Sequence, residues 1–340
     1  MWTRSELKNM AKTNLHNKYW IAFLISLLTA LLGGGTGIVS FNFNSGDLQM
    51  RNMNWNRMME GDFSEFGNWI NSWLDSEHFW QNLLPIIIGA LFLALLSFLI
   101  ALAFQLFVSA VVEAGSCRWF SRSRESTATP TIVQLFHLFK SPHYLKTVGS
   151  MAWMKLFLFL WGLLASLPPL VLSGIFFRMF INLPGLGLRW DTPEMVLESM
   201  SRLYGELLPV AALSLLLAVL FNIPLLIKTY SYRMTPWILG DNSQIGFKRA
   251  LKLSMDLTRG HKWKMFVLDL SFIGWFILGG LACGVGVLFV LPYYQAVQAE
   301  LYAQLRQNGV SGGLCTMEEL GFIRVEPAGS SNVQPDANPL

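Results

Sequence analysis

Two charged residues lie within stretches of this chain that are otherwise apolar. Asp269 lies inside the apolar run that follows Lys264, and Lys155 lies at a similar depth in the run that begins at Met151. Charges within a membrane are costly, and they commonly pair with each other or mark a transport path. We therefore expect Lys155 and Asp269 to form a pair near the inner membrane surface. In the structural alternative, each side chain reaches the polar interface separately.

A group of cations in the last third of the chain could contact lipid headgroups. Its members are Lys248, Arg249, Lys252, Arg259, Lys262 and Lys264. A helical projection of residues 243–259 places most of these cations on one side and Phe247, Leu251 and Leu257 on the other. Such an amphipathic cationic helix is typical of segments that lie on a membrane surface, so we expect contact with anionic headgroups. The usual excess of cations in cytoplasmic loops explains the same residues without a binding role.

Patterns that would indicate catalysis, a cofactor or a metal are missing from the sequence. Cys117, Cys283 and Cys315 lie far apart and lack the spacing of a zinc site. His137 and His143 have no carboxylate or thiol partners at suitable spacing. The glycine motifs of phosphate loops, nucleophile elbows and dinucleotide sites do not occur. We expect a protein that is not an enzyme and binds no cofactor.

The composition indicates the elements that must position these residues. Hydrophobic residues make up 53% of the chain and charged residues only 14%, with a mean hydropathy of +0.43. About a quarter of the residues in a soluble domain are charged, so this chain is expected to cross a membrane. The net charge of +4 resides beside the apolar runs rather than in a patch interleaved with aromatic residues, which disfavours nucleic acid as a partner.

The apolar runs predict an all-α polytopic bundle with six spans. We place them at about residues 19–40, 83–112, 151–181, 207–227, 265–283 and 287–306. The last two would form a hairpin that turns at Gly284–Gly286, and the cationic helix would precede them. A protein with five spans, in which residues 265–294 form one long tilted helix and the tail lies outside, is the alternative.

The remaining segments are assigned from charge and composition. Residues 1–18 are expected to form an amphipathic segment, residues 41–82 an outer loop rich in aromatic side chains, and residues 307–340 a disordered tail. The segment before Tyr19 and the loops 113–150 and 228–264 hold 17 of the 25 Lys and Arg residues. This asymmetry predicts that these three segments, and with them the N-terminus, face the cytoplasm.

Several short motifs in the chain resemble those of a known family. They include Tyr232-Arg233-Met234, Trp237-Ile238-Leu239-Gly240-Asp241, Gly260-His261-Lys262-Trp263, Leu291-Pro292-Tyr293 and Glu300-Leu301-Tyr302, with weaker matches at Tyr19-Trp20 and at Glu113-Ala114-Gly115. Together they resemble the bacterial membrane family called domain of unknown function 975. The resemblance implies a multi-span protein of the bacterial cytoplasmic membrane. It implies no reaction and carries no catalytic residues.

The expected function follows from these patterns and this resemblance. We expect a non-enzymatic membrane component that organises lipid or assists another membrane protein. Its predicted partners are the lipid bilayer and anionic headgroups, and a protein partner or a second copy is left open. The alternative is the membrane component of a transporter that works with a separate ATPase, since Pro168-Pro169 and Pro224 could break helices around a cavity.

Overall fold

The computed structural model describes residues 2–32, 77–126, 128–181, 193–281 and 284–322, and within these ranges the secondary structure is helical. This confirms the all-α prediction. The elements are α1 (Arg4–Leu15), α2 (Tyr19–Leu32), α5 (Glu77–Phe104), η1 (Gln105–Ser109), α6 (Ala110–Glu125), η2 (Ile132–Phe139), α7 (Tyr144–Ile181), α8 (Pro193–Tyr232), α9 (Thr235–Asp241), α10 (Phe247–Thr258), α11 (Lys262–Leu270), α12 (Ile273–Leu281) and α13 (Val285–Ser311). The predicted outer loop lies outside the described residues up to residue 76.

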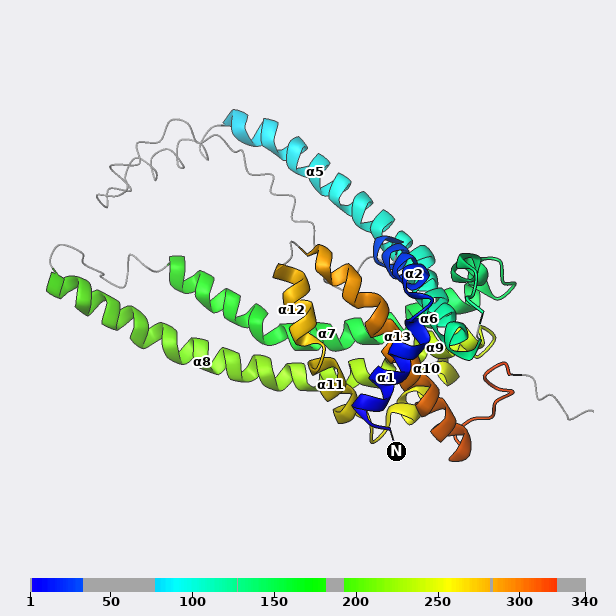
Figure 1. Cartoon of the computed structure of the whole chain (residues 1–340). Helices are drawn as coiled ribbons and strands as arrows, with labels where there is room; N and C mark the ends of the chain where they lie inside the picture. The colour runs from blue at the N-terminus through cyan, green and yellow to red at the C-terminus, as the bar shows by residue number, and fades with distance from the viewer. Residues whose placement is uncertain (1, 33–76, 127, 182–192, 282–283, 323–340) are drawn as a thin grey trace, which may run out of the picture.

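Long apolar helices extend from a compact end of the molecule (Figure 1). Helices α7 and α8 pack along each other, and the described side chains of α5 from Leu84 to Phe104 are exposed. Apolar side chains that are exposed in this number are suited to lipid rather than to water. Helix α7 continues through Pro168 and Pro169, where the sequence had suggested a break.

The predicted six spans are confirmed only in part. Among the residues that the structure describes, four helices are long and apolar enough to cross a membrane: Leu84–Glu125, Tyr144–Phe177, Leu207–Asp241 and Lys262–Leu281. Helices α1 and α2 add a fifth if they are taken as one span that is bent by 104°. The predicted span 287–306 lies on α13, which is not among them. Its second half carries buried polar residues such as Gln298 and Glu300, which lower its hydropathy.

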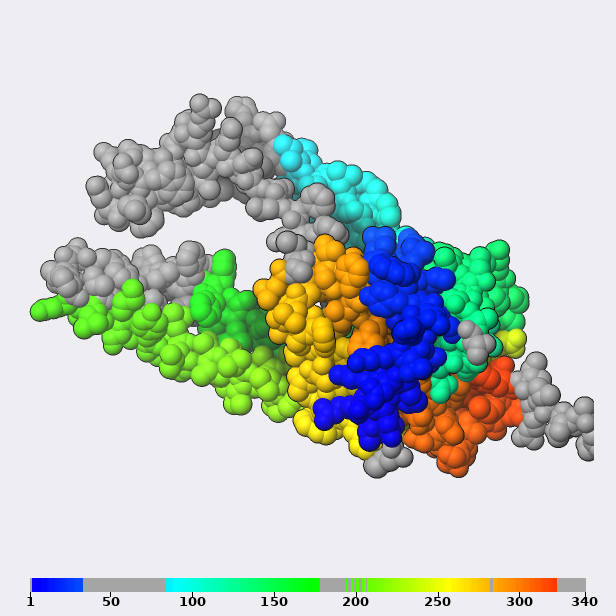
Figure 2. Space-filling view, viewed as in Figure 1, coloured from blue at the N-terminus to red at the C-terminus, as the bar shows by residue number. Residues whose placement is uncertain are grey.

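The compact end is built from α1, α6, η2, α9, α10 and the second half of α13 (Figures 1 and 2). Helix α1 begins with a capping box, in which Thr3 and Glu6 each accept a hydrogen bond from the other's backbone nitrogen. Its buried residues Leu7, Ala11 and Leu15 lie on one face, and α1 packs against α13. The three cation-rich segments of the sequence therefore meet in one part of the molecule.

Helix α10 corresponds to the predicted cationic amphipathic helix, but its apolar face is not free to enter lipid. Ala250, Leu251, Leu253 and Leu257 are buried, and α10 packs against α7, α8, α9 and α13. The apolar side of α10 therefore meets protein, and contact with lipid headgroups stays a prediction for its cationic side. Amphipathicity alone does not distinguish a face that meets lipid from one that meets protein.

The chain turns between α12 and α13 as the hairpin prediction requires. Gly284 has a φ of +76°, a left-handed conformation that favours glycine. A Cβ atom at Gly279 would lie 2.7 Å from the backbone nitrogen of Val287, so the two helices approach closely there. Residues 282–283, at the end of the predicted span 265–283, lie outside the described part.

The ordered chain continues beyond the predicted start of the tail at residue 307. Helix α13 ends at Ser311, and the residues that follow fold back onto the compact end with Cys315 and Leu320 buried. Arg249 of α10 binds Glu319 of this segment at 2.6 Å. The predicted tail is therefore structured up to residue 322, since two buried side chains and an ion pair hold it. Its polar composition gave no indication of these contacts.

Candidate functional site: a polar cavity beside a charge cluster

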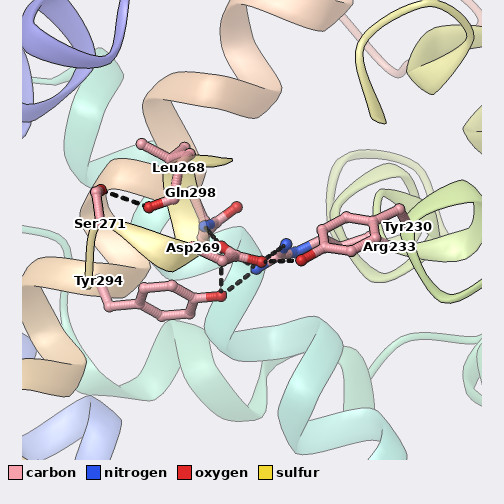
Figure 3. Close-up of polar contacts among 7 residues, drawn as sticks. All are labelled: Tyr230, Arg233, Leu268, Asp269, Ser271, Tyr294 and Gln298. Atoms are coloured by element: carbon pink, nitrogen blue, oxygen red, sulfur yellow. Dashed lines mark hydrogen bonds and ion pairs between the residues drawn. The ribbon is translucent and has the colours of Figure 1, made fainter. Parts of the chain in front are cut away.

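Asp269 of α11 lies at the centre of a cluster of polar side chains (Figure 3). Tyr230 donates a hydrogen bond to its Oδ2 at 2.7 Å, and Tyr294 donates to its Oδ1 at 3.2 Å. The guanidinium of Arg233 binds both carboxylate oxygens and also donates to the Tyr294 hydroxyl. The amide of Gln298 contacts Oδ1 at 3.4 Å. Asp269 thus joins α8, α11 and α13, and its charge is matched by Arg233.

Lys155 has a different partner from the predicted one. Its Nζ lies 3.4 Å from Oε2 of Glu113, at the start of α6. The expected pair of Lys155 with Asp269 is therefore replaced by two separate pairs. Lys155 was predicted as the partner of Asp269 because the two lie at a similar depth in their apolar runs. The partner of each residue depends instead on the direction in which its side chain leaves the helix.

Glu113 and Lys155 of one pair and Arg233 of the other line a cavity of about 260 Å³. Its wall is formed by residues of α2, η1, α6, α7, α9 and α13, with Arg233 between α8 and α9. The lining residues are Ser26, Thr29, Ala30, Gln105, Glu113, Ser116, Cys117, Lys155, Arg233, Pro236, Trp237, Leu291, Gln295 and Gln298. We call this the polar cavity, since nine of these residues carry hydroxyl, amide or charged groups.

Three buried polar atoms on the wall of the polar cavity lack a protein partner. They are the hydroxyl oxygens of Ser26 and Ser116 and the Oε1 of Gln298. These residues are 4%, 2% and 3% exposed, so bulk solvent does not reach them freely. Buried polar groups in native proteins are nearly always hydrogen-bonded, and unpaired ones call for an explanation.

A π-helical turn positions one part of the wall. Helix η1 (Gln105–Ser109) interrupts the long apolar helix formed by α5 and α6 and begins with Gln105, which lines the cavity. Turns of this kind occur often at functional sites because the extra residue redirects the side chains that follow. Ser109 at the end of the turn donates a hydrogen bond to the Leu32 carbonyl at 2.7 Å, which ties α2 to this wall.

A second network of charged residues holds the compact end together. Arg306 of α13 binds Asp241 of α9 at 3.0 Å and Glu125 of α6 at 2.7 Å. Tyr302 donates a hydrogen bond to the same oxygen of Asp241 at 2.7 Å. Nearby, Arg124 binds Glu300 at 2.7 Å. We call Arg306, Asp241, Glu125 and Tyr302 the Arg306 network.

Sequence reasoning identified Asp269 but missed its partners and the Arg306 network. The spacing held a signal, because Arg233, just past the end of α8, follows Tyr230 by three residues, and Tyr294 and Gln298 are four apart on α13. Residues at these spacings share a helix face. From the sequence, Arg233 was placed in a family motif and among the cations of a loop, and was not paired with Asp269.

The six predicted headgroup residues occupy different environments. Lys252 and Arg259 are exposed, whereas Arg249 is engaged by Glu319 and by the Leu314 carbonyl. The ammonium groups of Lys248 and Lys264 lie over the rings of Phe247 and Trp2. Lys262 is half-buried. The hydrogen bond from Arg249 lowers the pKa of Glu319 below its ordinary value.

The side chains of these sites take part in hydrogen bonds and ion pairs. Among the residues that the structure describes, no group of His, Cys, Asp and Glu side chains could hold a metal ion. The described carboxylates of the polar cavity and the Arg306 network are each engaged by a cation. Cys117 on the cavity wall is buried.

Residues 104–309, more than half of the chain, match the family model described as a protein of unknown function (DUF975). No curated protein and no solved structure matches the chain. The matched range contains both ion pairs of the polar cavity and the whole Arg306 network.

Proposed function

This chain belongs to the DUF975 family of proteins of unknown function, and we propose that it is a non-enzymatic membrane protein that organises lipid or assists another membrane protein. In this proposal it resides in the bacterial cytoplasmic membrane, with the compact end and the N-terminus in the cytoplasm. The family match and the helical architecture support the resemblance identified in the sequence.

The observation that carries this proposal is the contrast between the two parts of the molecule. Helices α5, α7 and α8 expose apolar side chains along most of their lengths, which would meet acyl chains. Several buried or half-buried charged residues of the compact end form ion pairs that join helices. A rigid polar end attached to long apolar helices is suited to shaping the lipid around it.

Exposed cations on and after α10 provide the contact with anionic lipid in this proposal. Lys252 and Arg259 are exposed, and cations next to a membrane surface attract anionic headgroups. In contrast, Arg249 is bound to Glu319 and would contribute to folding rather than to lipid contact.

A charge-reversal experiment tests this assignment. The Lys252→Glu/Arg259→Glu variant should retain less phosphatidylglycerol than the wild type when lipids bound in mild detergent are measured by native mass spectrometry. Arg249→Gln is the matched control and should retain the wild-type amount. Equal retention by all three proteins would contradict the headgroup contact.

The polar cavity favours one second candidate, the membrane component of a transporter that works with a separate ATPase. Polar cavities between helices are where transporters hold their substrates. Mass spectrometry of the proteins that co-purify with the tagged chain from its native membrane separates the two. Enriched lipid without a stoichiometric protein partner supports the organising role, and a stoichiometric ATPase would replace it with the transporter role.

A further inference from the structure

A groove on the surface of the molecule lies at the bend between α1 and α2. Both helices lie against α13, with α12 beside them (Figure 2). The groove has a volume of about 700 Å³, within the range of about 300–1,000 Å³ that is typical of ligand sites. Its lining residues are Lys12, Leu15, His16, Tyr19, Trp275, Phe289, Val290 and Tyr293. We call this the α1–α2 groove, and it shares no lining residue with the polar cavity.

Most of the wall of the α1–α2 groove is apolar. The hydroxyl of Tyr19 donates a hydrogen bond to the Phe289 carbonyl at 2.9 Å, and the hydroxyl of Tyr293 contacts the Lys8 carbonyl at 3.5 Å. Because both hydroxyls are engaged by the backbone, the other polar side chains of the lining are at the end of α1, at Lys12 and the following His16. An apolar wall with polar groups at one end is suited to an amphiphile.

The surface around the groove is suited to a lipid bilayer. Trp275 and Phe289 of the wall are 58% and 45% exposed, and Leu281 near the tip of the α12–α13 hairpin is 78% exposed. Tyrosine and tryptophan are enriched where a membrane meets water, and both types line the groove. In a membrane the apolar wall would therefore meet acyl chains.

Cations without an acidic partner lie at the α1 end of the groove. Lys12 is exposed, and Lys8, one turn earlier on α1, lies over the ring of Phe272 at 4.5 Å. Neither lysine forms an ion pair with a carboxylate of the described residues. Glu6 of the same helix is engaged by the backbone of Thr3 in the capping box. An anionic group beside Lys12 would supply a counter-charge that the described part of the protein does not.

We propose that the α1–α2 groove binds one anionic phospholipid, with an acyl chain along the aromatic wall and the phosphate beside Lys12. The acyl chain accounts for the apolar wall and the phosphate for the lysines, so one molecule satisfies both features. This proposal deepens the proposed function and rests on it, because it adds a defined lipid site to the headgroup contact at Lys252 and Arg259.

Photolabelling of the full chain in nanodiscs of phosphatidylcholine tests the site. The probe is phosphatidylglycerol with a diazirine in one acyl chain, and peptide mass spectrometry locates the label. The peptides that carry Tyr19, Trp275 and Tyr293 should be labelled about fivefold more than by a phosphatidylethanolamine probe with the same chain, since one cation beside anionic lipid contributes about 1 kcal/mol. Equal labelling by the two probes would overturn the proposal.

A substitution of Lys12 tests the counter-charge. Lys12→Gln should lower the labelling of the groove by the phosphatidylglycerol probe about fivefold, to the level of the phosphatidylethanolamine probe. Lys146→Gln is the matched control, because Lys146 is exposed on α7 and does not line the groove. It should be labelled as the wild type is. Equal losses in both variants would show that the net charge of the protein, and not the groove, attracts the probe.

A substitution of Trp275 tests the apolar wall. Trp275→Ala should reduce the labelling of Tyr19 and Tyr293 by both probes, whereas Trp20→Ala should not, because Trp20 is 71% exposed but does not line the groove. Both side chains are largely exposed, so both variants should melt at the wild-type temperature. Unchanged labelling in Trp275→Ala would contradict the seat of the acyl chain. An unlabelled groove in a dimeric protein would show that a second copy covers it, which also overturns the proposal.

The location of the label separates this proposal from the headgroup contact on α10. Wild-type labelling of the groove in the Lys252→Glu/Arg259→Glu variant would support the groove even if that variant retains as much phosphatidylglycerol as the wild type. Conversely, an unlabelled groove would overturn this proposal and leave the contact at α10 standing.

Discussion

Arg306 connects three helices through one buried guanidinium. It contacts Asp241 on α9 and Glu125 on α6, and Tyr302 completes the coordination of the Asp241 carboxylate. We expect Arg306→Met to lower the free energy of unfolding by about 3 kcal/mol, because the variant leaves a buried carboxylate without its counter-charge. Chemical denaturation in detergent measures the change.

A second substitution separates the loss of the pair from loss of packing. In Arg306→Met/Asp241→Asn the buried charge is also removed, and the stability should recover in part. If the double variant is as unstable as the sum of the two single variants, the two side chains act independently and the network is not the cause.

Glu319 should make the docking of the C-terminal segment dependent on pH. The guanidinium of Arg249 holds the pKa of this carboxyl below its ordinary value of 4.5. The ion pair with the Glu319 carboxylate therefore stabilises the docked segment fully above the ordinary pKa of the carboxyl. This stabilisation is lost as the pH falls through the lower pKa of Glu319 in the folded state. A spin label at residue 312, in a variant whose native cysteines are replaced, should become more mobile only in this acidic range. In Glu319→Gln its mobility should not change with pH.

Helix positions show where sequence reasoning succeeds and where it fails. Apolar runs predicted the helices because hydropathy reports burial in lipid or protein, and a charge in such a run drew attention to Asp269. The pairing of Asp269 with Arg233 depends on the rotation of α8 against α11, which no local pattern encodes. The polar cavity depends on the packing of several helices and could not be predicted from any one of them.

Gly115 permits the close approach of α6 and η2. A Cβ atom at this position would overlap the carbonyl oxygen of Leu135, which is backbone and cannot rotate away. We expect Gly115→Ala to lower the free energy of unfolding by about 3 kcal/mol through overpacking. Circular dichroism during denaturation in detergent measures this loss.

Gly149 is the matched control for that substitution. It lies on α7, and an added Cβ would meet nothing within 4 Å. Gly149→Ala should leave the stability unchanged or raise it by about 0.5–1 kcal/mol, since alanine is the better helix former. Equal losses in both variants would show that the contact with Leu135 is not the cause of the loss at Gly115.

At the scale of the whole molecule, segments far apart in the sequence return to the same end. The compact end contains α1, α6, η2, α9, α10 and the second half of α13 (Figure 1). Lys18 donates hydrogen bonds to the carbonyls of Ser123 and Ser126, so the start of the chain is attached to the end of α6. The distribution of Lys and Arg predicts that three of these segments lie on the same side of the membrane. Segments that contact one another in this way are consistent with that prediction.

This convergence predicts the sides on which the two ends of the chain lie. Because the described C-terminal residues are bound to α10 through Arg249 and Glu319, and α1 packs on α13, we expect the two ends to lie on one side of the membrane. A reporter fused after residue 340 and a thiol label at Lys12→Cys, in a variant without native cysteines, should both report the cytoplasm. A reporter that is active outside the cell would require an odd number of crossings, as in the five-span alternative. An external reporter would also require that Arg249 and Arg306 do not make these contacts in the membrane. In that case the Arg306→Met variant should melt at the same temperature as the wild type.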